Sequence, residues 1–247
     1  MLVPDPEDVQ RRVVAAGFVP IGPNEAHYER RHHLQPLWHP DYGVKIEIHR
    51  RPEWVRWSAP PPQAELFDVA VPAAVGVAGI STLPPAQHAL IVAAHSWSNL
   101  PLRRLLDLVD VLLLALEAGR AQIEELADRW DLAGVWRTMI EAADALLGNA
   151  KPTLALRTWA RDLVLVREPT VAETHLRRLA GPLWALPPRR AAPETLAVLA
   201  REIRPAPGES WRAKHLRSAR ALQNAFRPRS EHERALSGDD SRDQVSV

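Results

Sequence analysis

Short alternating runs of apolar and polar residues occupy the chain between residues 18 and 50. The clearest run is Val44-Lys45-Ile46-Glu47-Ile48-His49-Arg50, in which every second residue up to Ile48 is apolar. Alternation with a period of two is typical of a strand that has one apolar and one polar face. The turn sequence Asp41-Tyr42-Gly43 precedes this run. The segment is therefore predicted to form the second strand of a hairpin, with Lys45, Glu47 and His49 on its polar face.

A short helix is predicted ahead of these strands. Asp5 can cap it, Pro6 suits its first turn, and Gly17 supplies a C-terminal stop. Its buried stripe is expected to consist of Val9, Val13 and Val14. Further strands are predicted over residues 18–21, 26–31 and 34–38, followed by an irregular connection over residues 51–62 that is rich in Pro and Trp.

From about Glu65 the apolar period becomes helical. One predicted helix opens at Pro84-Pro85, and another opens at Pro101 and ends at Gly119. On the second helix, Arg103 and Asp107 are four residues apart and are expected to pair. Further helices are predicted over residues 123–130, 135–147, 154–166, 171–179, 194–203 and 211–226.

The predicted fold class is α+β. It comprises a small, incomplete mixed β-sheet with a helix at the N-terminus, followed by a predominantly helical C-terminal region. The predicted domains are an α+β domain over residues 1–62 and a helical domain over residues 63–227. Residues 228–247 are polar and patternless, so they are expected to form a disordered tail.

Composition narrows the classes of function. The chain has 247 residues, of which 46% are hydrophobic, and a formal net charge of +1. A charge this small gives no whole-molecule field that would attract nucleic acid or an anionic membrane. There is no cysteine, and the N-terminus has no apolar signal core. These features predict a cytoplasmic protein without a membrane partner, and they do not favour a nucleic-acid partner.

Three other patterns could indicate binding sites, but we prefer to interpret each as structural or as solvated surface. Ten histidines invite a zinc site, but no HExxH or paired-Cys spacing is present. Residues 50–57 interleave Arg and Trp, as proteins that bind single-stranded nucleic acid do. Packing at the boundary between two domains explains these residues as well. The basic helix near residue 214 could meet nucleic acid or an anionic surface. We expect it instead to dock through Trp211, Leu216, Ala219 and Leu222, leaving Arg212, Lys214, Arg217 and Arg220 in solvent.

Six short motifs follow one another over roughly residues 1–150. They are Leu2-Val3-Pro4, Ala16-Gly17-Phe18, His33-Leu34-Gln35-Pro36-Leu37, Ile46-Glu47-Ile48-His49, the segment 90–95 and the segment 102–107. In this order and spacing the chain resembles the uncharacterised nucleotidyltransferase family of the polymerase-β-like superfamily. The resemblance implies metal-dependent transfer of a nucleotidyl group from a nucleoside triphosphate, with Mg²⁺, to an acceptor that the sequence does not identify. The sequence does not specify the oligomeric state either.

The resemblance also assigns roles to residues. Glu47 matches the family's third metal-binding carboxylate, so it is the expected catalytic and metal-binding residue, with Lys45 and His49 beside it as expected nucleotide-binding residues. The family's Gly-Ser segment and acidic Asp-x-Asp pair align before Met1. One carboxylate cannot hold two metal ions, so this chain is expected to be an inactive, N-terminally truncated member. The alternative is a non-catalytic scaffold or interaction module derived from that fold. An Asp-x-Asp encoded in frame directly upstream would favour the first interpretation.

Overall fold

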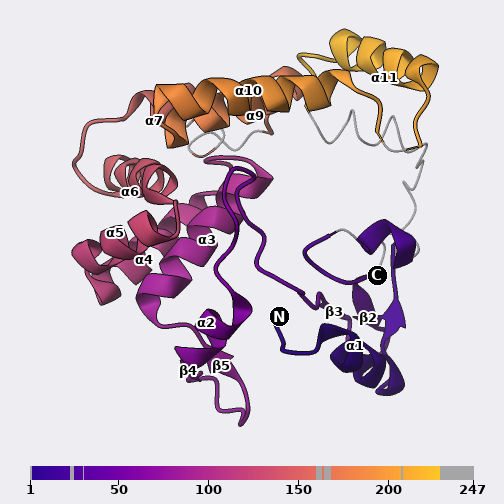
Figure 1. Ribbon diagram of the computed structural model, residues 1–247, viewed down its shortest axis with the longest axis vertical. Helices are drawn as coiled ribbons and strands as arrows, with labels where there is room; N and C mark the ends of the chain where they lie inside the picture. Colours follow the sequence, from indigo (N-terminus) through magenta and orange to yellow (C-terminus); the bar gives the residue numbers. More distant parts are fainter. Residues whose placement is uncertain are drawn as a thin grey trace.

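The structure is a computed structural model that describes residues 2–22, 25–29, 31–159, 163, 168–206 and 208–228. It contains a small N-terminal unit with three strands and a larger helical unit (Figure 1). The α+β class predicted from the sequence is confirmed. The expected disordered tail lies outside the described residues except for Pro228, which forms a bridge with Thr170.

The N-terminal unit begins with helix α1 (Pro6–Ala15). Its predicted cap is confirmed, because the Asp5 carboxylate accepts a hydrogen bond of 3.0 Å from the Asp8 N–H. Strands β1 (Val19–Pro20), β2 (Leu37–His39) and β3 (Val44–Ile46) form an antiparallel sheet in the order β1-β2-β3. The hairpin predicted around Asp41-Tyr42-Gly43 joins β2 and β3.

Several local predictions in this unit are wrong. The strand predicted over residues 26–31 is not found, and the 3₁₀ helix η1 (Glu25–Tyr28) occupies the first half of that range. Strand β3 ends at Ile46, earlier than the predicted Arg50. Beyond β3, His49 forms single bridges, parallel with Leu2 and antiparallel with His33. Within the described residues, the parallel pairing expected in a mixed sheet is therefore limited to the single bridge between Leu2 and His49.

The apolar cluster of this unit is small. Leu34, Leu37 and Ile48 are each only 1% exposed, and Val9 and Val13 of α1 pack against them. Val14 and Val44 were predicted to be buried but are 40% and 46% exposed. A helix resting on a narrow sheet can bury only the stripe that faces the sheet, so these two valines remain at the edge of the contact.

The helical unit begins with α2 (Gln63–Asp68) and a two-stranded hairpin, β4 (Val71–Pro72) with β5 (Ser81–Thr82), which the sequence did not predict. A bundle of four helices follows, formed by α3 (Pro85–Asn99), α4 (Leu105–Ala118), α5 (Arg120–Arg129) and α6 (Ala133–Leu147). The later helices are α7 (Leu154–Trp159), α9 (Val171–Ala185), α10 (Pro188–Ile203) and α11 (Trp211–Gln223). In Figure 1, α9 and α10 lie across the top of the bundle, with α11 at their far end.

Two predictions at the start of α4 are also wrong. The helix begins at Leu105 rather than near Pro101, because Leu102 adopts a φ of 53° that a right-handed helix excludes. Arg103 lies before the helix and forms no ion pair with Asp107 in the described structure. Asp107 instead accepts a hydrogen bond of 2.6 Å from the Ser96 hydroxyl of α3, which ties the two helices together.

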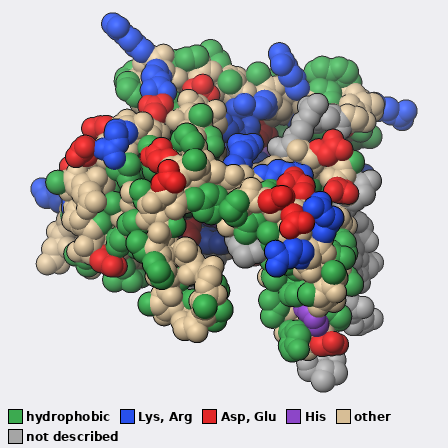
Figure 2. Space-filling model, turned by 60° about the horizontal axis from the view of Figure 1, so that its bottom comes forward, with side chains coloured by type: hydrophobic (Ala, Val, Ile, Leu, Met, Phe, Trp, Pro, Cys, Tyr) green, Lys and Arg blue, Asp and Glu red, His purple; other side chains and the backbone are tan. Residues whose placement is uncertain are grey.

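A connector over residues 51–62 links the two units. Trp54 and Val55 in this connector are buried in the core of the helical unit, and Trp54 packs edge-on against Trp130. Packing therefore accounts for Trp54, as expected. Figure 2 shows the N-terminal unit at the lower right as a lobe set apart by a notch. Among the described helices, none has the combination of length and apolar character that crossing a bilayer requires.

Candidate functional site

Glu47 lies just after β3, on the same side of the chain as Lys45. The Lys45 ammonium is 2.6 Å from one Glu47 carboxylate oxygen, and the side chain of Glu47 is 37% exposed. This hydrogen-bonded pairing holds the pKa of Glu47 below its ordinary value. The carboxylate is thus ionised and reachable from solvent. The structure brings the three predicted residues together, since His49 Nε2 is 4.0 Å from the other Glu47 oxygen.

His49 belongs to a histidine cluster behind Glu47. Its ring centroid is 5.3 Å from that of His32 and 5.7 Å from that of His33. Burial lowers the pKa of His49 to about 4, and the nearby His32 and His33 act in the same direction. Burial also lowers the pKa of His32. Neutral imidazoles in this position can donate or accept a proton in a hydrogen bond without adding positive charge next to Glu47.

The residues described do not make up a complete magnesium site of the kind that the resemblance implies. Mg²⁺ prefers octahedral oxygen coordination, usually with carboxylates among its ligands. Within the described ranges, no three His, Asp or Glu side chains are grouped so that they could hold a metal ion. Glu47 is the one carboxylate at this position, and Lys45 already engages it. The described residues therefore do not hold the two ions that two-metal transfer requires.

Polar contacts connect this cluster to the helical unit. Glu53 in the connector lies 3.6 Å from His32 Nε2 and 3.2 Å from His95 Nδ1, measured from the same carboxylate oxygen. Asn99, at the end of α3, donates a hydrogen bond of 3.0 Å to that oxygen. The series from Glu47 through His49, His32 and Glu53 to Asn99 thus crosses from one unit to the other.

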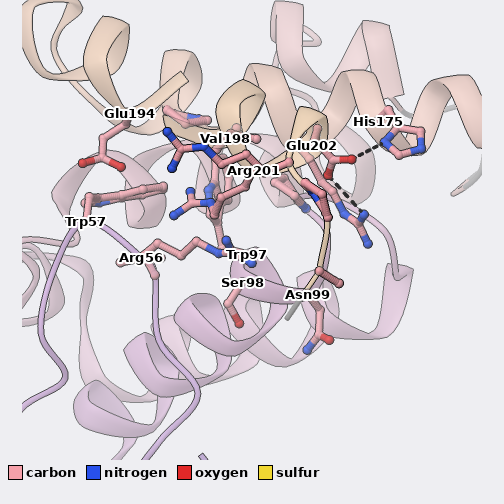
Figure 3. Close-up of a pocket in the computed structure, with 18 of the residues that line it drawn as sticks. Arg56, Trp57, Trp97, Ser98, Asn99, His175, Glu194, Val198, Arg201 and Glu202 are labelled. Atoms are coloured by element: carbon pink, nitrogen blue, oxygen red, sulfur yellow. Dashed lines mark ion pairs between the residues drawn. The ribbon is translucent and has the colours of Figure 1, made fainter. Parts of the chain in front are cut away.

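Asn99 also lines a cavity of about 620 Å³ in the helical unit. The connector supplies Arg56 and Trp57, the end of α3 supplies Trp97, and helices α9, α10 and α11 close the other sides (Figure 3). Glu202 of α10 pairs with His175 and Arg178 of α9, at 3.1 and 3.7 Å. These ion pairs hold α9 and α10 together at one end of the cavity.

The prediction for α11 is wrong for Lys214 and for the apolar residues. Lys214 is 5% exposed, and its ammonium donates a short hydrogen bond to the Glu202 carbonyl oxygen. Arg217 also lines the cavity and pairs with Glu209 through two hydrogen bonds, at 2.9 and 2.8 Å. The apolar residues expected to dock are exposed instead: Trp211 at 56%, Leu216 at 55% and Leu222 at 78%. Of the four basic residues expected in solvent, Lys214 is buried, whereas Arg212, Arg217 and Arg220 are exposed, as predicted.

The sequence indicated part of this cavity but not its function. Arg56 and Trp57 fall in the interleaved Arg and Trp segment, and Lys214 falls in the basic helix, yet we interpreted both as packing or solvated surface. Arg201 lies on α10 with no distinctive motif around it. Its neighbours in the cavity come from distant parts of the chain, so no spacing along the sequence could have revealed it.

Comparison of the chain with models of known protein families, with curated proteins and with solved structures finds no match. The resemblance to the nucleotidyltransferase family therefore stays a prediction from the sequence motifs.

Proposed function

We propose that the protein is a cytoplasmic member of the nucleotidyltransferase family and that Glu47 is its third metal-binding carboxylate. The observation that carries the proposal is the parallel bridge between Leu2 and His49. The resemblance aligns residues 2–4 with the segment that follows the family's acidic pair. Leu2 thus pairs with His49, two residues after Glu47, and this is the neighbour relation that a shared metal site in the family arrangement needs.

The exposed, ionised state of Glu47 also supports this role, because a metal-binding acid must be charged and reachable. In the proposal, Lys45 and His49 contact the phosphates of a nucleoside triphosphate, and the acceptor is a separate molecule. Since the described residues supply one of the three carboxylates, the 247-residue chain should bind nucleotide weakly and transfer nothing.

The first test measures binding of a non-hydrolysable nucleoside triphosphate analogue to the purified chain, with and without Mn²⁺. We expect weak binding that Mn²⁺ strengthens in the wild type and not in Glu47→Gln. Asp41→Asn, in the turn of the same hairpin, removes a similar charge and should behave like the wild type. Equal Mn²⁺ dependence in wild type and Glu47→Gln would refute the assignment of Glu47.

The second test incubates the chain with labelled nucleoside triphosphates, Mg²⁺ or Mn²⁺, and a cell extract. We expect the chain to leave every protein and metabolite without label beyond that of the extract alone, because the electrostatic stabilisation that dominates phosphoryl transfer needs the complete set of acids. Robust labelling that requires the chain would show that the acids are placed wrongly.

A non-catalytic binding module is the second candidate. The observation in its favour is the cation-rich cavity of the helical unit, which includes neither Glu47 nor its neighbours in its lining. Absence of any Mn²⁺-dependent binding of nucleotide, with the fold intact, would favour this candidate.

A further inference from the structure

The cavity between the connector, α3 and helices α9 to α11 carries an excess of positive charge. Its lining includes six Lys and Arg residues (Arg56, Arg178, Arg201, Arg204, Lys214 and Arg217) and two acids (Glu194 and Glu202). Glu202 is already engaged by His175 and Arg178, and Arg217 by Glu209. For the side chains of Arg56, Arg201 and Arg204, the structure shows no hydrogen bond or ion pair with any other described residue.

Arg56 and Arg201 extend into the same space from the connector and from α10 (Figure 3). Desolvation lowers the pKa of Arg56, and the charge of Arg201 lowers it further, while the Glu202 carboxylate acts in the opposite direction. Both residues are exposed, so solvent screens the repulsion between their guanidinium groups. An anion between them would turn this repulsion into two favourable interactions, since guanidinium forks match phosphate oxygens.

A buried donor in the same cavity also lacks a partner. Trp97 is 3% exposed, and its indole N–H makes no hydrogen bond with any other described residue. An unpaired buried donor is costly, so such a group is usually satisfied by water or a ligand. Gly181 of α9, also in the lining, leaves room beside this nitrogen, because even an added Cβ would lie 3.8 Å from it. The indole of Trp57 supplies a second aromatic surface on the connector side.

We propose that this cavity binds a small organic phosphate that carries a planar ring. Arg56 and Arg201 hold the phosphate, Trp97 donates its indole N–H to the ligand, and the ring lies against Trp57. The volume of about 620 Å³ is within the range of pockets that hold ligands of nucleotide size. The proposal does not depend on nucleotidyl transfer at Glu47, because it uses a different set of residues.

Titration calorimetry on the full chain tests this proposal with four probes: adenosine monophosphate, adenosine, ribose 5-phosphate and inorganic phosphate. We expect adenosine monophosphate to bind at least tenfold more tightly than each of the other three. Equal binding of the monophosphate and ribose 5-phosphate would show that the ring plays no part. Equal binding of the monophosphate and adenosine, or no binding of any probe at millimolar concentration, would overturn the phosphate site.

Variants distinguish this site from general charge effects. Arg56→Gln and Arg201→Gln should each weaken binding of the monophosphate at least tenfold. Arg189→Gln removes the same charge from α10 at an exposed position outside the cavity and should change binding less than twofold. Equal losses in all three would mean that only net charge matters. Glu47→Gln should leave this binding unchanged, so a failure here is separable from a failure of the proposed transferase function.

The melting temperature of Arg201→Gln distinguishes a binding role of Arg201 from a structural role. A structural role predicts a lower melting temperature, whereas a binding role predicts an unchanged or higher one. Removing one of two repelling charges should leave the melting temperature of the ligand-free protein unchanged or raise it. A clear fall, together with unchanged affinity in the folded fraction, would assign Arg201 to the fold and contradict the site.

Discussion

At the scale of single residues, a few positively charged side chains have neighbours that are unusual for a protein surface. The chain contains only three lysines, Lys45, Lys151 and Lys214. Lys45 holds the Glu47 carboxylate, and Lys214 is buried against α10 beside the cavity. The arginines Arg56 and Arg201 line the same cavity, and each adds positive charge beside the other. In each case the neighbours, and not the residue type, determine what the side chain can do.

Replacing Glu47 by Gln should change the stability of the protein very little. Its ion pair with Lys45 is half exposed, and pairs of this kind contribute roughly 0–1 kcal/mol. Thermal unfolding of Glu47→Gln at pH 7 should therefore follow the wild type closely. A variant that unfolds at room temperature would make Glu47 a structural residue and remove the support for its functional role.

His49 should make stability depend on pH. Its pKa is about 4 in the folded protein, below the value of about 6.5 in an unfolded chain. The unfolded state therefore takes up the proton first as the pH falls. Stability is full above pH 6.5 and declines towards pH 4, by up to about 3 kcal/mol if the whole shift is realised.

Denaturant unfolding between pH 7.5 and 4.5 measures this effect. His49→Gln should lose part of the decline, and the remainder should include the contribution of His32, whose pKa burial also lowers. His215→Gln, at an exposed position on α11, should retain the wild-type decline. A decline of the same size in His49→Gln as in the wild type would contradict the burial argument.

At the scale of elements, short sequence signals predicted the helices and the hairpin whose formation depends on neighbouring residues in the chain. Caps, prolines and the helical period located α1, α3, α5 and α6 closely, and the turn located the β2–β3 hairpin. The sequence could not give the orientation of α11, because that depends on partners from α10 and the connector. A helix with an apolar side is usually docked by that side, but in α11 the buried ammonium of Lys214 and the Glu202 carbonyl oxygen face each other.

The contact between α6 and the end of α9 depends on a glycine. A Cβ on Gly134 would lie 1.7 Å from the Ala185 carbonyl oxygen, a backbone atom that cannot rotate away. Thr138 strengthens the same contact by donating to the Trp184 carbonyl oxygen at 3.1 Å. Gly134→Ala should therefore destabilise the protein by about 3 kcal/mol or more, because the helices must separate.

Gly181→Ala on α9 is the matched control for this substitution. Its Cβ would make only ordinary contacts, the nearest at 3.5 Å to Pro101, and alanine favours a helix by up to about 1 kcal/mol. Chemical denaturation should therefore show a large loss for Gly134→Ala and little change or a gain for Gly181→Ala. Similar losses in both would mean that the close approach at Gly134 is not the cause.

At the scale of the whole molecule, two apolar clusters of unequal size are joined by polar contacts. The cluster around Leu34, Leu37 and Ile48 is small, whereas the cluster of the helical unit extends over the connector, α2 to α7 and the end of α9. The sequence predicted two parts from the change of period near residue 65. It did not predict that Glu53 would link them, since His32, His95 and Asn99 approach it from two units.

The small cluster should therefore open more easily than the large one, and Glu53 should limit this opening. A small, polar contact between units leaves each with its own stability, so removing one link affects mainly the weaker unit. In Glu53→Gln, amide hydrogen exchange should become faster over residues 33–48 and stay unchanged in α5 and α6. Glu125→Gln breaks an exposed pair with Arg129 within α5 and should leave residues 33–48 unaffected. Uniform acceleration across both units in Glu53→Gln would instead show that the chain opens as one cooperative body, in which the polar link has no separate role.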